Sequence, residues 1–365
     1  MKYQFYFNES RINDFIEFPR LIFSEEELNT IDGDDLFYEI ADKTYLEFLN
    51  RSSSYLKPLK KEIEFFYSKD FMESYDFNYL ITKANSFFGF DNEESYLEKL
   101  LSLTEEEMKQ SIISTMLSIE QKNTNILDLM EKAAEISNDK KEIMNLINDL
   151  PIDSGVKWNL LLIIEDTKKY MNQYIELMYK ILPIYLNLYS EIEPIIKDYG
   201  PYFVDMLNNK GEEGLEEITF SMIESDLITE DANNVLISYI SSFVLKISTT
   251  SPTPYFAWGV QMEKVFQSMK ERMENKLNER VQIFKNLGDK TRYEVLRLIA
   301  NGETSTKNIA KALEVSSATI SYHISALVTS HIIKYEKSNN HIGYLVDFKY
   351  IEEAYIGLKN DLNIK

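Results

Sequence analysis

The side chains best placed to do chemistry lie near the carboxyl end of the chain, between residues 317 and 330. Five of them recur at the three- and four-residue spacing that puts side chains on one helix face. Hydroxyl groups can exchange hydrogen bonds with base edges in the major groove of DNA, and a methyl group can contact thymine. The candidates for base contact, with Thr319 added, are Ala318, Thr319, Ser321, Tyr322, Ser325 and Thr329. An ordinary solvated helix face explains the same pattern, so that alternative stays open.

Phosphate contacts must come from residues around this helix, because the helix itself contains no Lys or Arg. The candidates are Arg292, Lys307, Lys311, Ser317, Lys334, Lys337, Asn339 and Asn340. His323 lies at the edge of the apolar stripe, and we expect a packed or helix-capping histidine there, with a phosphate contact as the alternative. His331 and His341 are too scattered for a zinc site, so a structural role is expected for both.

Catalytic and cofactor chemistry finds no support in the sequence. The chain has no cysteine, and its three histidines all lie in the last 86 residues. No phosphate-binding glycine loop, dinucleotide fingerprint, zinc-protease motif or nucleophile elbow is present. The run from Asp32 to Asp35 lacks calcium-loop spacing and is interpreted as a turn. We therefore expect no enzyme, no metal and no cofactor.

The elements that would position the candidate face are three short helices and a hairpin. Asp289, Ser305 and Ser316 are typical capping residues, and they predict helices over 290–300, 306–313 and 318–330. Two strands, 332–337 and 342–346, are predicted around a turn rich in Ser and Asn. Two helices joined by a tight turn and followed by a hairpin make a winged helix-turn-helix.

This stretch, 284–345, resembles the ArsR-type winged-helix regulators of bacteria. The residues that carry the resemblance are Leu287–Arg292 (LGDKTR), Val295–Leu298 (VLRL), Ile309–Leu313 (IAKAL) and Ser317–Ile324 (SATISYHI), with Tyr344–Leu345 in the closing strand. The resemblance implies a homodimer that binds a palindromic operator on double-stranded DNA.

Three departures from the family pattern matter. Glu314 and His331 stand where the family has glycine, and a left-handed conformation at Glu314 would cost about 1 kcal/mol. The metal-sensing branch of the family uses cysteines, which this chain lacks. Metal or arsenic sensing through thiolates is therefore excluded.

Charge divides the chain sharply. The net charge of 365 residues is −21, yet residues 280–365 carry +3 and the remainder −24. A mainly α fold is expected, with a large helical domain and a small sheet over 1–260, a long connector helix over 261–286, and the winged helix over 287–365. Strands are predicted at 2–7 and 255–260, whereas 235–240 and 243–247 fit either strands or one buried helix.

Other features of the front domain give further expectations. Ser24–Leu28 and Thr104 with its following acids are typical helix starts. A helical run is predicted from Asp153 toward Tyr199, with Pro183 kinking or splitting it. Gly211 to Gly214 is predicted to be a loop. The connector carries an apolar stripe that packs either on the core or on a second copy of the chain.

These patterns predict a cytoplasmic transcriptional regulator that contacts no membrane, since no apolar stretch is long enough to span one. An unidentified small-molecule or protein effector would act on the front domain. The alternative is a protein-interaction module in which the winged helix binds protein and the acidic front domain is the main binding surface.

Overall fold

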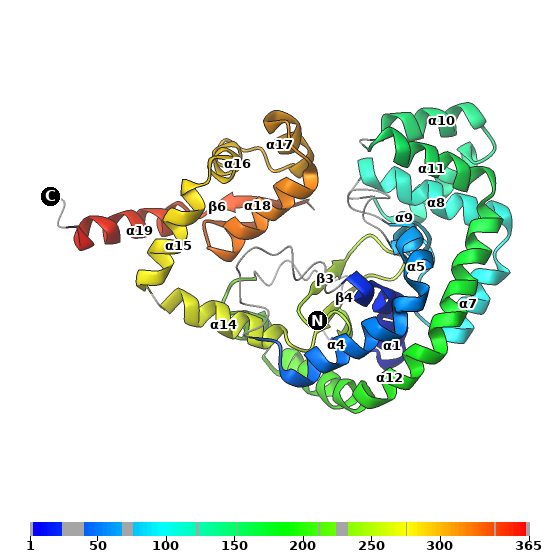
Figure 1. Cartoon of the computed structure of the whole chain (residues 1–365), viewed down its shortest axis with the longest axis horizontal. Helices are drawn as coiled ribbons and strands as arrows, with labels where there is room; N and C mark the ends of the chain where they lie inside the picture. Colours follow the sequence, from blue (N-terminus) through cyan, green and yellow to red (C-terminus); the bar gives the residue numbers. More distant parts are fainter. Residues whose placement is uncertain are drawn as a thin grey trace. The chain divides into compact units, whose positions relative to one another are not determined.

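The computed structural model describes residues 3–23, 40–67, 76–121, 124–150, 152–210, 212–223, 233–274, 276–338 and 341–362 (Figure 1). The chain divides into two compact units. Unit 1 comprises Met1–Gly214 and Ile228–Met262, and unit 2 comprises Leu215–Leu227 and Glu263–Lys365. Unit 2 therefore contains 215–227 as well as the carboxyl-terminal elements.

Unit 1 is mainly helical, as predicted. Its helices are α1 (Phe7–Glu17), η1 (Phe18–Phe23), α4 (Lys43–Leu56), η2 (Lys57–Leu59), α5 (Lys60–Tyr67), α6 (Phe77–Thr82), α7 (Glu93–Ser102), α8 (Glu105–Glu120), α9 (Ile126–Ile136), α10 (Lys140–Asp149), α11 (Ser154–Glu165) and α12 (Thr167–Lys210). The predicted start at Thr104 is confirmed, because Thr104 and Glu107 form a reciprocal capping box at the head of α8.

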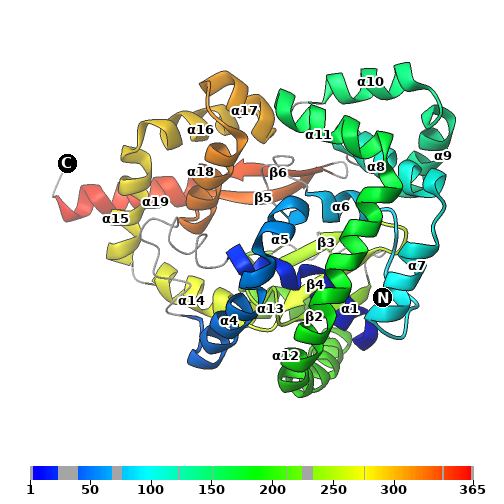
Figure 2. The same cartoon turned by 45° about the vertical axis from the view of Figure 1, so that its right-hand side comes forward.

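A four-stranded sheet lies in unit 1. It contains β1 (Gln4–Phe5), β2 (Asn234–Ser238), β3 (Leu245–Ser248) and β4 (Tyr255–Gly259) in the order β1-β2-β4-β3. β2 runs parallel to β1 and β4, and β3 is antiparallel to β4. The apolar runs 235–240 and 243–247 therefore contain strands, β2 and β3, and do not form one buried helix. α12 passes alongside this sheet (Figure 2). Phe203 of α12 stacks there on Trp258 with 4.8 Å between ring centroids.

Helix α1 completes the edge of β2 beyond the two residues of β1. The Ile237 amide donates to Ser10 Oγ at 3.0 Å, and the Tyr239 amide donates to Asp14 Oδ2 at 2.9 Å. Residues four apart on a helix are separated by about 6 Å along its axis, close to the roughly 6.6 Å between alternate strand residues. One helix face can therefore satisfy successive edge amides of a strand.

Three expectations for unit 1 are wrong in whole or in part. The first strand stops at Phe5, and α1 already begins at Phe7, because helix packing on the sheet outweighs the β-propensity of the aromatic run. The split expected at Pro183 does not occur, since α12 continues for 44 residues on a stripe of buried side chains and the break comes before it, at Asp166. The alternative, a kink at Pro183, stays a prediction. Gly214 lies in helix α13 (Glu212–Thr219), not in a loop.

Some expectations fall outside the described residues. These are the helix start at Ser24–Leu28, the turn from Asp32 to Asp35, and the loop glycine Gly211.

Unit 2 contains the helix-turn-helix. Its elements are α14 (Met262–Glu274), α15 (Lys276–Gly288), α16 (Lys290–Ala300), α17 (Thr306–Leu313), α18 (Ser317–Thr329), β5 (Ile333–Ser338), β6 (His341–Val346) and α19 (Phe348–Asp361). The predicted connector is helical on both sides of residue 275, which lies outside the described residues. Helix α19 was not predicted from the sequence. Its Gly357 lets the Arg280 side chain of α15 lie across it, and Arg280 pairs with Asp361 at 2.9 Å.

Candidate nucleic-acid interface

Helix α18 is positioned by a cap, a tight turn and a buried face. Ser316 caps it by accepting a hydrogen bond from the Thr319 amide at 3.0 Å. Ile320, Ile324 and Leu327 are buried in the core of unit 2. This apolar stripe holds the opposite face of α18 toward solvent.

The turn before α18 depends on a left-handed residue. Glu314 has φ 57° and ψ 38°, as its place in the resemblance implied, and the Val315 amide then donates to Ala310 O at 3.1 Å. His331, which ends α18, also has a positive φ of 56°. Both residues therefore adopt the conformation for which glycine is the least costly choice.

Four of the six base-contact candidates share one exposed face. Ala318, Ser321, Tyr322 and Ser325 are exposed, and Tyr322 retains 44% of its accessible surface. Thr319 and Thr329 are half-buried, and Thr319 Oγ1 lies 2.8 Å from Ser316 Oγ. A tyrosine ring flanked by hydroxyls and a methyl group forms the centre of this face.

The phosphate-contact candidates are divided by their exposure. Lys307 and Lys311 on α17 and Lys334 on β5 are exposed, and Ser317 is half-buried. Lys337 lies in β5, but its side chain is outside the described residues, as are Asn339 and Asn340. Three described lysines thus remain available around α18.

Arg292 fits a phosphate contact less well than expected. Its side chain is only 16% exposed, with Nη2 3.9 Å from Asp289 Oδ2. Its Nε is buried without a hydrogen-bond partner among the described residues. Most of this side chain is therefore shielded from solvent.

His323 packs behind the exposed face. Only 8% of it is accessible, and its ring meets Tyr322 edge-on at 5.4 Å. Burial lowers the pKa of His323, while Asp289 opposes this shift and Arg292 adds to it. The burial favours the packed histidine over the phosphate contact. The grouping of His323 with Asp289 and Arg292 was missed, because these residues are over 30 positions apart.

An exposed apolar stripe lies on α19. Phe348, Tyr355 and Leu362 are spaced seven residues apart and are exposed by 61%, 56% and 61%, with Ile356 beside them at 48%. Their spacing in the sequence is the local signal that could have predicted this surface helix. Within the described residues, no helix is both long and apolar enough to cross a membrane.

α16, α17 and α18 form a helix-turn-helix, and two comparisons support a DNA-binding transcriptional regulator. The family described as "Helix-turn-helix domain" matches residues 287–336, which span α16, α17, α18 and part of β5. The chain is also similar to the cadmium resistance transcriptional regulatory protein CadC homolog of Staphylococcus aureus. They are 26% identical over 95 residues, which cover 26% of this chain and 78% of that protein. No solved structure matches the chain.

Proposed function

We propose that this chain is an ArsR-type regulator that binds a palindromic operator as a homodimer. Helix α18 would enter the major groove, and the β5–β6 hairpin would act as the wing. The observation that supports this best is the exposed face of Ala318, Ser321, Tyr322 and Ser325, backed by a buried apolar stripe. The similarity of unit 2 to a regulatory protein adds support.

Homodimerisation in this proposal uses the α19 stripe. Exposed apolar side chains at seven-residue spacing suit packing against the same helix of a second copy. A two-fold axis would then present two α18 helices to half-sites about 34 Å apart, one helical turn of DNA.

The direct test is an electrophoretic mobility shift of the full chain on the DNA upstream of its own gene. The double variant Tyr322→Ala/Ser325→Ala should weaken binding by roughly 30-fold or more, because each of the two lost base contacts removes about 1–3 kcal/mol. Tyr55→Ala, which removes an exposed tyrosine from unit 1, serves as the matched control and should bind like the wild type. Unchanged binding by the double variant would refute the assigned face.

Salt dependence separates DNA binding from the alternative, a protein-interaction module. Binding through phosphates loses affinity steeply as salt rises. Three single variants, Lys307→Gln, Lys311→Gln and Lys334→Gln, test the phosphate contacts. Each should reduce the slope of the logarithm of the DNA-binding constant against the logarithm of salt concentration by about 1. Absence of any DNA binding at low salt would favour the alternative, in which the acidic front unit is the main binding surface.

Unit 1 has a regulatory, non-enzymatic role in this proposal, and a small-molecule or protein effector would act on it in the cytoplasm. Because the chain has no cysteine, an effector metal could not be held by thiolates. Thermal-shift screening of the full chain tests this role, and a compound that is chemically altered during binding would contradict it.

A further inference from the structure

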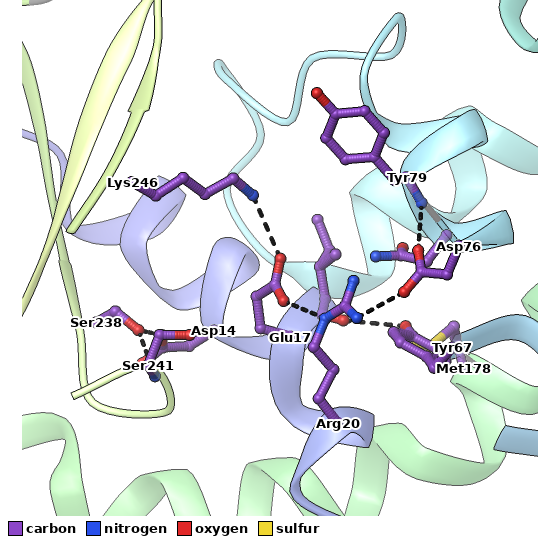
Figure 3. A network of polar contacts seen from close by, with 12 residues as sticks. Asp14, Glu17, Arg20, Tyr67, Asp76, Tyr79, Met178, Ser238, Ser241 and Lys246 are labelled. Atoms are coloured by element: carbon purple, nitrogen blue, oxygen red, sulfur yellow. Dashed lines mark hydrogen bonds and ion pairs between the residues drawn. The ribbon is translucent and has the colours of Figure 1, made fainter. Parts of the chain in front are cut away.

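Asp14 of unit 1 is a fully buried acid without a cation. Its side chain has 0% exposure, and no Lys or Arg of the described residues lies within ion-pair distance of it. Three donors face its carboxyl group. They are Ser238 Oγ at 2.5 Å (Figure 3), the Tyr239 amide at 2.9 Å and the Ile240 amide at 3.4 Å. Burial raises the pKa of Asp14 from 3.8 to about 7, although these hydrogen bonds oppose the shift.

The charged neighbours of Asp14 are already paired with one another. Glu17, three residues on, is held by Arg20 and Lys246 (Figure 3). Arg11 is held by Glu93.

The other titratable groups facing Asp14 are tyrosines. They are Tyr45 from α4 and Tyr185 and Tyr189 from α12, and burial raises the pKa of each. These phenols stay neutral near pH 7. Among the described residues, hydrogen-bond donors therefore stabilise a negative charge on Asp14, and no cation does.

The segment that Asp14 holds is the β2–β3 loop, residues 239–244. Ser238 Oγ, which contacts Asp14, also accepts a hydrogen bond from the Ser241 amide at 2.9 Å. The Tyr45 hydroxyl donates to Ile240 O at 3.0 Å from the α4 side. Asp14 therefore closes the first turn of this loop against α1.

This loop in turn holds the exit segment, residues 260–262, through which the chain leaves unit 1. The Val260 amide donates to Ser238 O at 3.0 Å, and the Gln261 amide donates to Ser242 O at 2.9 Å. Gly259 lies so close to the loop that an added Cβ would be 2.2 Å from Ser242 O. Helix α14 begins at Met262, directly after these bonds.

We propose that Asp14 is a proton-operated latch on the β2–β3 loop. With the proton bound, the neutral carboxyl group stays buried and the loop stays closed. Opening exposes the carboxyl group to water, which favours release of the proton to solvent and frees the exit segment. The closed conformation of the exit segment, which leads into α14, therefore depends on protonation of Asp14.

The direction of the effect follows from proton linkage. The closed state binds the proton more tightly than the open state, whose carboxyl group has an ordinary affinity. The opening constant should therefore rise roughly tenfold per pH unit above about pH 4 and level off above about pH 7.

Hydrogen exchange of the full chain, followed by mass spectrometry between pH 5.5 and 8.5 and corrected for intrinsic exchange, tests the latch. Protection of residues 239–244 and 259–262 should fall by roughly tenfold from pH 5.5 to 6.5 and change little above 7.5. Asp14→Asn should make this profile flat. Asp198→Asn, which changes an exposed aspartate of α12, should leave it unchanged.

A second variant keeps the test decisive if Asp14→Asn does not fold. Ser238→Ala removes a donor to the carboxylate, so its profile should level off at a higher pH than that of the wild type. A flat wild-type profile, an equal fall in α8 as in the loop, or an unchanged slope in Asp14→Asn would each overturn the proposal. No DNA enters this test, so its outcome is independent of the proposed function.

Discussion

At the residue scale, two buried tyrosines of α12 differ in what their hydroxyls contact. The Tyr174 hydroxyl donates to Asn78 Oδ1 at 2.6 Å, whereas the Tyr189 hydroxyl has no hydrogen-bond partner among the described residues. Both side chains are at most 2% exposed. The same chemical change at the two positions should therefore have different energetic consequences.

Replacing each tyrosine by phenylalanine measures this difference. Tyr174→Phe should lower the free energy of unfolding by about 1–3 kcal/mol, because it leaves Asn78 buried without its donor. Tyr189→Phe should be neutral or slightly stabilising, because no bond is lost. Chemical denaturation of both variants checks the prediction, and equal losses would contradict the assigned hydrogen bonds.

The histidines of unit 2 make its stability depend on pH. Burial lowers the pKa of both His323 and His331 below the ordinary value of 6.5. The unfolded chain then binds more protons, so stability contributed by the neutral rings is complete above pH 6.5 and is lost as pH falls below it. NMR titration of the ring carbons should show both histidines titrating below pH 6.5, with His323→Gln and His331→Gln assigning the signals. A midpoint at or above 6.5 for either would contradict its burial.

At the element scale, the turn between α17 and α18 carries strain that a glycine would relieve. Glu314 is exposed and left-handed, so Glu314→Gly should raise the free energy of unfolding of unit 2 by up to about 1 kcal/mol. His331→Gly is the matched comparison at a similar φ. It should gain less, because it also removes a ring that packs on Tyr350 with 5.9 Å between centroids. Thermal unfolding of both variants measures the two effects, and a destabilised Glu314→Gly would contradict the backbone conformation.

The end of β4 and the start of α11 give a second matched pair at this scale. Gly259→Ala should lower the free energy of unfolding by about 1–3 kcal/mol, because its Cβ would overlap the backbone of Ser241 and Ser242. Gly155→Ala in α11 should be neutral or stabilising by up to about 1 kcal/mol, since nothing lies within 4 Å of its Cβ. Denaturant titration of each variant gives the comparison. A tolerated alanine at 259 would show that the β2–β3 loop is not held closely against β4.

At the scale of the whole molecule, the distribution of charge determines which part can approach DNA. Residues 1–279 carry a net charge of −24, and only the remaining residues are net positive, at +3. Phosphates should repel the acidic part, so binding depends on the small basic part. Because +3 is modest, we expect tight binding to require two copies of unit 2 on one DNA site.

The α19 stripe predicts the oligomeric state on which this depends. Tyr355→Glu should shift the full chain from dimer to monomer in sedimentation analysis, because a charge would be buried in the proposed α19–α19 contact. Tyr55→Glu, which places the same charge on α4 of unit 1, should leave the dimer intact. A wild-type chain that is monomeric at all concentrations would rule out the dimer.

The helix-turn-helix could be predicted from the sequence because its signals are local. The signals are capping residues, Asp289, Ser305 and Ser316, and the apolar stripes between them, and each signal spans only a few residues. All three helices form where these signals predict them. The exposed face of α18 follows from the same periodicity. Helix α19 lies beyond the closing strand, where the family motifs give no indication of a further element.

The fold of unit 1 could not be predicted in the same way, because it depends on contacts between residues that are distant in the sequence. The edge of β2 is completed by Ser10 and Asp14, which lie more than 220 positions away, and no local pattern shows that pairing. Buried side chains along α12 likewise keep the helix continuous through Pro183. Local propensities and motifs thus indicated the helix-turn-helix and the exposed face of α18. Only the tertiary structure showed that the buried Asp14 has no cation within ion-pair distance among the described residues, because burial and pairing depend on neighbours that are distant in the sequence.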